Sequence, residues 1–241
     1  MDSVTSKLSN TWIINTHGEN HTPENSSYIL DDVLTVFTLY VPIDKNRVMN
    51  ILEDPSGPMY LNDRITILLK TAGSTYYAQN AYQMAHELCH FAAFYGIKNE
   101  SFKWFEESIC DLSSHFFLHE LADFWKNSSD ELKKSYSSNF ISYDNLARKK
   151  IKKFDLKDLS NLNSETYTYL CEHKIDREMN TYVANKLFPI FRKTPDLWKA
   201  IPHLQFADAD HDFIRFLRSW RDCSPAETQQ GITKIIHHFA N

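Results

Sequence analysis

The sequence predicts an α+β fold in which a strand-rich N-terminal lobe is followed by a helical lobe. β-Branched and aromatic residues gather in the first 75 positions, where turn-forming residues separate them. From about residue 77 onward, apolar residues recur with the period of helices. A chain of 241 residues is long enough to bury a core. We therefore expect one domain, with a strand-rich part over residues 1–98 and a helical part over residues 99–241.

Three segments of the N-terminal part have the composition of strands. The expected strands are 11–15, 33–41 (VLTVFTLYV) and 64–70 (RITILLK). Residues 54–58 (DPSGP) are typical of a turn.

Two long helices are expected after these strands. The first covers about residues 77–95 and is ended by Gly96, because glycine suits the left-handed position just past a helix. The second covers about residues 102–126. The remaining chain has helical periodicity, and Pro189 is expected to end or kink one of its helices. Polar breaks occur near 127–129, 161–164 and 223–225.

Composition excludes several classes of protein. Hydrophobic residues make up 42% and charged residues 24%, which is ordinary for a globular protein, and the net charge of -5 gives no reason to expect a nucleic-acid partner. No apolar run is long enough to span a bilayer, the N-terminus lacks a signal-peptide pattern, and the four cysteines show no close pairing. The five glycines are scattered, which excludes glycine-rich phosphate loops. We expect a cytoplasmic protein without a membrane partner.

The most informative segment is His86-Glu87-Leu88-Cys89-His90. Histidines four residues apart lie on one face of a helix, so both imidazoles can bind one metal ion. Glu87, beside the first histidine, can then reach a water on that ion. This arrangement is typical of hydrolysis by a metal-activated water with the glutamate as general base.

A third ligand is expected from the next helix. Glu107 is favoured because Asp111 follows one turn later, where it can hold the second ring nitrogen of a bound histidine. Glu106 points about 100° away and is the alternative ligand. His115, one more turn along, is either an outer-shell residue or a surface histidine.

Burial supports the metal interpretation. Between Met84 and Tyr95, every side chain other than His86, Glu87 and His90 is apolar or aromatic. Burying three ionisable groups is costly unless they are compensated, and a metal ion supplies that compensation. Two core histidines bonded to backbone carbonyls are the alternative, but they leave Glu87 unexplained.

The HExxH motif followed by W-x-x-E-x-x-x-[DE] resembles the gluzincin zinc metallopeptidases over residues 80–114. The resemblance implies a zincin-like fold with an active-site cleft and one Zn²⁺ per chain, with peptides or proteins as substrates. It makes His86, His90 and Glu107 the zinc ligands, Glu87 the catalytic base and Asp111 the partner of His86. It also implies an edge strand that takes up substrate backbone, for which 64–70 is the candidate.

Two departures from the family are visible. The gap between His90 and Glu107 is slightly shorter than in the best-known members, and no G-x-M-E-N segment of the aminopeptidases occurs.

The family also uses a tyrosine or histidine from the helical lobe to stabilise the oxyanion. Tyr182 is the choice here because it opens an apolar helical stretch about 75 residues after Glu107. The rival candidates are Tyr169, His173, His203 and His211.

Three other functions stay open. A zinc hydrolase can act on a non-peptide acyl substrate, since the chemistry does not select the acyl group. A catalytically inactive zincin-like protein can serve binding or regulation. A purely structural zinc site is disfavoured, because it would fill the fourth position with cysteine or histidine.

Overall fold

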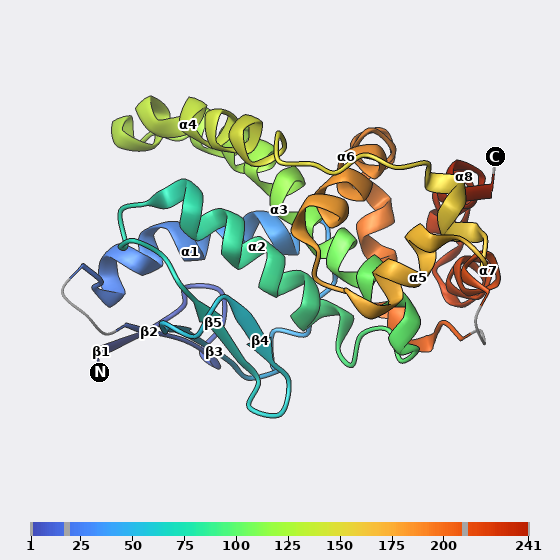
Figure 1. Cartoon of the computed structure of the whole chain (residues 1–241). Coiled ribbons are helices and arrows are strands. Elements are labelled where there is room, and N and C mark those ends of the chain that lie inside the picture. The colour runs from blue at the N-terminus through green and yellow to red at the C-terminus, as the bar shows by residue number, and fades with distance from the viewer. Residues whose placement is uncertain (1, 17–19, 209–211, 241) are drawn as a thin grey trace. The chain divides into compact units, whose positions relative to one another are not determined.

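The computed structural model describes residues 2–16, 20–208 and 212–240, and its helices and strands are labelled in Figure 1. The fold is α+β, as the sequence predicts: a small mixed sheet of five strands accompanies a majority of helices. The chain forms two compact units, which are described separately. The first comprises Met1–Ala92 and Ser113–Ala147, and the second comprises Ala93–Leu112 and Arg148–Asn241.

The sheet of the first unit has the strand order β1-β2-β3-β5-β4. Strands β2, β3 and β5 are parallel to one another, whereas the outer strands β1 and β4 run antiparallel to their neighbours. The strands are β1 (Asp2–Thr5), β2 (Trp12–Thr16), β3 (Met49–Glu53), β4 (Met59–Leu61) and β5 (Thr66–Leu69).

Two of the predicted strands are confirmed as β2 and β5, but the third prediction is wrong. Residues 33–38 belong to the helix α1 (Pro23–Thr38). Thr22 caps its N-terminus by accepting a hydrogen bond from the amide of Asn25, and Pro23 occupies the first turn. Its buried apolar residues recur at the helical spacing and override the strand propensity of valine and threonine: Ile29, Leu30, Val33, Leu34 and Phe37.

The position of β5 corrects a second expectation. Residues 64–70 were expected to form an edge strand, yet β5 pairs with β3 on one side and with β4 on the other. The edge strands of the sheet are β1 and, beside β5, the short antiparallel strand β4.

One face of this sheet is buried by helices. Alternate residues of β2 and β3 are buried, and Trp12 and Ile14 pair with Met49 and Ile51 on that face. Figure 1 shows α1 and α2 (Tyr77–Ala93) on the same side of the sheet. The alternation thus places the helix that carries His86 and His90 over a hydrophobic layer.

The two long helices were predicted with almost their observed bounds. They are α2 (Tyr77–Ala93) and α3 (Lys103–Lys126), separated by the short 3-10 helix Glu100–Phe102. The break at 127–129 leads into α4 (Glu131–Ala147). The phenol of Tyr136 on α4 accepts a hydrogen bond from the amide of Ala78 in the first turn of α2.

The second unit is helical and has an aromatic core. Phe105 and Phe213 lie in its centre with ring centroids 5.2 Å apart. Pro189 does not end its helix, because α6 continues to Lys193. The elements are the 3-10 helices Leu156–Ser160 and Pro195–Phe206 and the α-helices α5 (Glu165–Glu172), α6 (Arg177–Lys193), α7 (Phe213–Cys223) and α8 (Ala226–Ala240).

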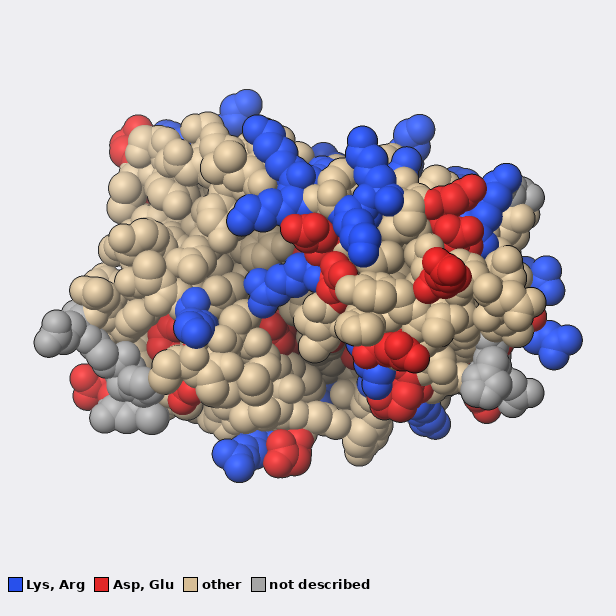
Figure 2. Space-filling model, in the orientation of Figure 1, with Lys and Arg blue, Asp and Glu red and all other residues tan. Residues whose placement is uncertain are grey.

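Surface charge is mixed. On the face shown in Figure 2, Lys and Arg side chains lie beside Asp and Glu side chains, so that neither sign covers the face alone. Among the described residues, no helix is long and apolar enough to cross a membrane.

Candidate metal centre

The HExxH segment lies in the C-terminal half of α2. Glu87 is buried at 3% exposure, whereas His86 and His90 are partly exposed. The helix stops at Ala93, after which Phe94 and Gly96 both have left-handed backbone, with φ values of 65° and 62°. Gly96 therefore takes the conformation that the sequence predicts for it.

Hydrogen bonds fix the register of α3 against α2. The hydroxyl of Ser113 donates to the carbonyl of Ala85 over 2.7 Å, and the hydroxyl of Ser114 donates to the carbonyl of Tyr82 over 2.8 Å. Both acceptor carbonyls lie in the turn of α2 that precedes His86. A small side chain is needed at these positions for the helices to approach closely.

Three residues expected as ligands come together. One potential ligand atom from each of His86, His90 and Glu107 lies within 4.8 Å of the others, and all three residues are partly buried. The two imidazole rings have centroids 5.2 Å apart. Two imidazoles and a carboxylate are a donor set that suits zinc with one position left open.

Glu106 has a different role. Its carboxylate accepts the amide of Ile97 over 2.8 Å and lies 3.3 Å from the ammonium of Lys103. It also fills the space beside Gly96, where a Cβ atom would overlap its oxygens. This carboxylate ties the turn after α2 to the first turns of α3, and the geometry favours Glu107 over Glu106 as a ligand.

Asp111 is buried at 8% exposure and accepts a hydrogen bond from the hydroxyl of Thr181 on α6 over 2.6 Å. The neighbouring Asn180 donates to the carbonyl of Trp104 over 2.9 Å. Together these bonds hold α6 along the start of α3. Sequence reasoning missed Thr181, which is 70 residues away from Asp111 and has no motif around it.

Tyr182 follows Thr181 directly on α6. Its ring packs against Phe154 with centroids 5.0 Å apart, and the ammonium of Lys186 lies 5.4 Å from the ring centre. Consecutive helical residues point about 100° apart, so Tyr182 and Thr181 face different directions. The assignment of Tyr182 as an oxyanion donor stays a prediction.

The rival donors have other contacts. The phenol of Tyr169 donates to Asp176 over 3.0 Å, and this bond raises the pKa of Tyr169. His173 stacks on Tyr169 at 4.2 Å, and the ring of His203 lies beside Phe206. His211 lies outside the described residues.

His115 is not a surface histidine, because it is fully buried. Its Nδ1 lies 2.6 Å from one oxygen of Asp144 on α4, and Nε2 of His119 lies 2.8 Å from the other. Burial alone would raise the pKa of the fully buried Asp144, but the hydrogen bonds from the two histidines outweigh it and lower the pKa to about 2. This group holds α4 against α3, and sequence spacing did not reveal Asp144 as its centre.

Comparison of the chain with protein-family models, with curated proteins and with solved structures finds no match to any of them. The functional argument therefore depends on the chemistry of the residues themselves.

Proposed function

We propose that this protein is a zinc-dependent peptidase in which His86, His90 and Glu107 hold the metal ion and Glu87 is the general base. One observation carries the proposal: the ligand atoms of these three residues lie within 4.8 Å of one another beside a buried glutamate. A glutamate next to the first histidine has no role in a structural zinc site, but it has one in hydrolysis.

The bound zinc ion would supply Lewis acidity, which activates a water molecule and polarises a carbonyl group. Glu87 takes the proton of the attacking water and later gives it to the leaving amine. Its burial at 3% exposure keeps bulk water away from the carboxylate during this transfer.

Asp111 and Tyr182 have supporting roles in this proposal. Asp111 orients the ring of His86, and the hydroxyl of Thr181 holds the Asp111 carboxylate in one rotamer. Tyr182 would donate a hydrogen bond from its phenol to the oxyanion, for which its ring would have to turn from its packing against Phe154.

The sheet supports a peptide substrate. The open edge next to β5 is β4, and β5 leads through residues 70–76 directly into α2. An extended peptide can add to such an edge through backbone hydrogen bonds. The zincin-like fold that the sequence resemblance implies has an edge strand just before the helix with the metal-binding histidines, and substrate backbone pairs with that strand. In this protein the proposed edge strand is β4 rather than residues 64–70.

Metal content is the primary test. Zinc and iron are measured by plasma mass spectrometry in the wild type, Glu107→Gln and Glu106→Gln. We expect about one zinc per chain in the wild type and in Glu106→Gln, and loss of zinc in Glu107→Gln. Glu106→Gln is the matched control, because its amide oxygen can still accept the amide of Ile97. Absence of zinc from reconstituted wild type would overturn the proposal.

Hydrolysis is tested separately with quenched-fluorescent peptide libraries. Glu87→Gln should keep its zinc and lose activity by about 10²- to 10⁴-fold. Zinc binding without cleavage of peptides would favour a hydrolase of another acyl substrate, or a zincin-like binding protein that has lost catalysis.

A further inference from the structure

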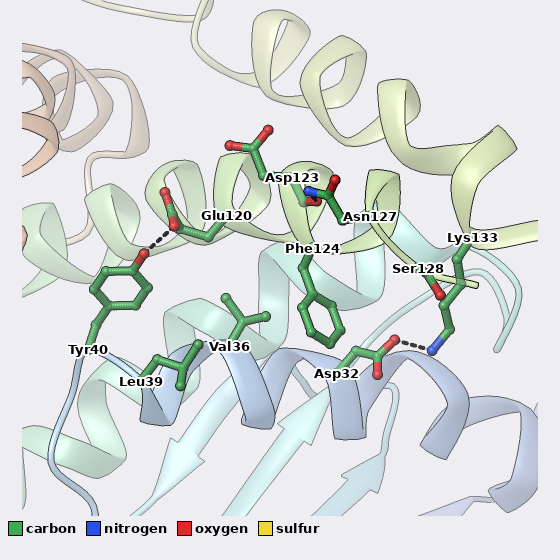
Figure 3. A pocket seen from close by; sticks show the side chains of 10 residues that line it. All are labelled: Asp32, Val36, Leu39, Tyr40, Glu120, Asp123, Phe124, Asn127, Ser128 and Lys133. Atoms are coloured by element: carbon green, nitrogen blue, oxygen red, sulfur yellow. Dashed lines mark hydrogen bonds and ion pairs between the residues drawn. The ribbon is translucent and has the colours of Figure 1, made fainter. Parts of the chain in front are cut away.

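The first unit has a groove whose lining includes none of the residues of the candidate metal centre. Its volume is about 450 Å³, within the range of about 300–1,000 Å³ for ligand sites. Figure 3 shows it between α1 and the end of α3, with Lys133 of α4 at one end. The lining residues are Asp32, Val36, Leu39, Tyr40, Glu120, Asp123, Phe124, Asn127, Ser128 and Lys133.

The groove has an apolar floor that is open to water. Phe124 points from α3 towards α1, and Val36 and Leu39 lie along the same side of the groove (Figure 3). Leu39 is 72% exposed and Phe124 is 40% exposed, although both are large apolar side chains. Covering such a floor with an apolar side chain of a partner removes this surface from water.

The rim is acidic. Three carboxylates line the groove against one ammonium, and one of them, Glu120, accepts a hydrogen bond from the phenol of Tyr40. Lys133 is already bound, 2.5 Å from Asp32 and 4.5 Å from the ring centre of Tyr28. Asp123 is exposed, and its carboxylate has no ion pair among the residues that the structure describes. Its negative charge is therefore available to a ligand.

The helix ends strengthen this field. Helix α1 ends at Thr38 and α3 ends at Lys126, so the groove residues Tyr40 and Asn127 lie just past two C-termini. Carbonyl groups at a helix C-terminus carry a partial negative charge that favours cations. The last turn of α1 contains no basic residue that would neutralise this charge, whereas Lys126 lies in the last turn of α3, so the favourable field comes from the end of α1.

We propose that this groove docks a short peptide segment in which an apolar side chain is flanked by lysine or arginine. The apolar side chain covers Leu39 and Phe124, and a flanking cation pairs with Asp123. The floor and rim match this occupant in hydrophobicity and in charge. An acidic segment would instead face the three carboxylates that line the groove. This inference does not depend on the proposed peptidase activity.

The test uses the full chain carrying Glu87→Gln, so that a bound peptide is not consumed. A fluorescein-labelled peptide of alternating lysine and leucine is titrated by fluorescence polarisation, beside the counterpart with glutamate in place of lysine. We expect saturable binding of the basic peptide only, unchanged by a chelator. Asp123→Lys and Phe124→Ser should each weaken it by about tenfold or more.

Two matched controls carry the same changes elsewhere. Asp63→Lys reverses a charge on a side chain that is 77% exposed, and Leu132→Ser removes an apolar side chain that is 52% exposed. Both should bind the peptide as tightly as the parent. Equal binding of the acidic peptide, no saturable binding, or insensitivity to Asp123→Lys would overturn the proposal. So would a dimer in sedimentation velocity that Phe124→Ser converts to a monomer, because the occupant would then be a second copy.

Discussion

Replacing Asp144 by asparagine removes the charge at the centre of the group that joins α3 to α4 while it keeps the size of the side chain. Asp144 is fully buried and bonds to His115 and His119. The amide can still bond to the rings, but the charge-assisted part of both hydrogen bonds is lost. We expect a large decrease in the free energy of unfolding at neutral pH.

The magnitude follows from the pKa of the carboxyl group. The pKa falls from 3.8 to about 2, and one pKa unit corresponds to about 1.4 kcal/mol, so the ionised Asp144 stabilises the first unit by roughly 2 kcal/mol. Exchanging two charge-assisted hydrogen bonds for neutral ones costs roughly 2–3 kcal/mol, which agrees. Because the folded pKa is lowered, this stabilisation is complete above about pH 4 and is lost as the pH falls from 3.8 towards 2.

Urea unfolding at pH 7 and pH 3 measures this difference, and hydrogen exchange of the amides of 131–147 reports on α4 itself. The difference in free energy of unfolding between wild type and Asp144→Asn should be about half as large at pH 3 as at pH 7. Asp123→Asn on the exposed side of α3 is the control and should change stability by less than about 0.5 kcal/mol. A difference in free energy of unfolding below about 0.5 kcal/mol at pH 7, or one that does not depend on pH, would refute the stabilising role of the ionised Asp144.

Three further substitutions have defined outcomes. Gly96→Ala should lower the free energy of unfolding by about 1–3 kcal/mol in urea titrations, because φ is 62° and the new methyl group would overlap the carboxylate of Glu106. Thr22→Ala should cost about 1 kcal/mol in the same assay, since it removes the N-cap of α1. Thr181→Val should weaken zinc binding by about 10- to 100-fold in chelator competition, because Asp111 loses its hydroxyl donor.

Each of these has a control on the same chain. Ser27→Ala removes an exposed hydroxyl of α1 and is the control for the two stability measurements, in which it should leave the free energy of unfolding nearly unchanged. Thr168→Val removes an exposed hydroxyl of α5 and is the control for the zinc assay, in which it should leave zinc affinity nearly unchanged. Unchanged stability of Gly96→Ala would mean that Glu106 can move away from the turn. Unchanged zinc affinity of Thr181→Val would mean that the bond between Thr181 and Asp111 does not affect metal binding.

The three residues that could hold a metal ion were grouped from the sequence because the pattern that groups them is local. His86 and His90 share a helical face through their spacing alone, and Glu107 was chosen from the positions of its neighbours on α3. The sequence favoured Glu107 and kept Glu106 as the alternative, because it does not reveal that the Glu106 carboxylate accepts the amide of Ile97 across a turn. Thr181 could not be found, because a contact across 70 residues leaves no periodic pattern.

The sheet was harder to predict than the helices. Residues 33–38 have strand-forming side chains, and only the Thr22 cap and the spacing of buried residues on α1 reveal a helix. Strand order depends on pairing between distant segments, so the sequence identified the strand β5 but not its neighbours. The short strands β1, β3 and β4 lack a pattern strong enough to distinguish them from loops.

The length of β4 limits what its open edge can bind. Three residues, Met59–Leu61, extend over about 10 Å, which leaves room for only a few backbone hydrogen bonds to an added strand. An edge this short is a poor template for the open-ended pairing of sheets between protein molecules, so the protein can leave it uncovered without inviting aggregation. The same brevity means that a peptide bound there gains little from its backbone, and selectivity must come from the side chains on either side.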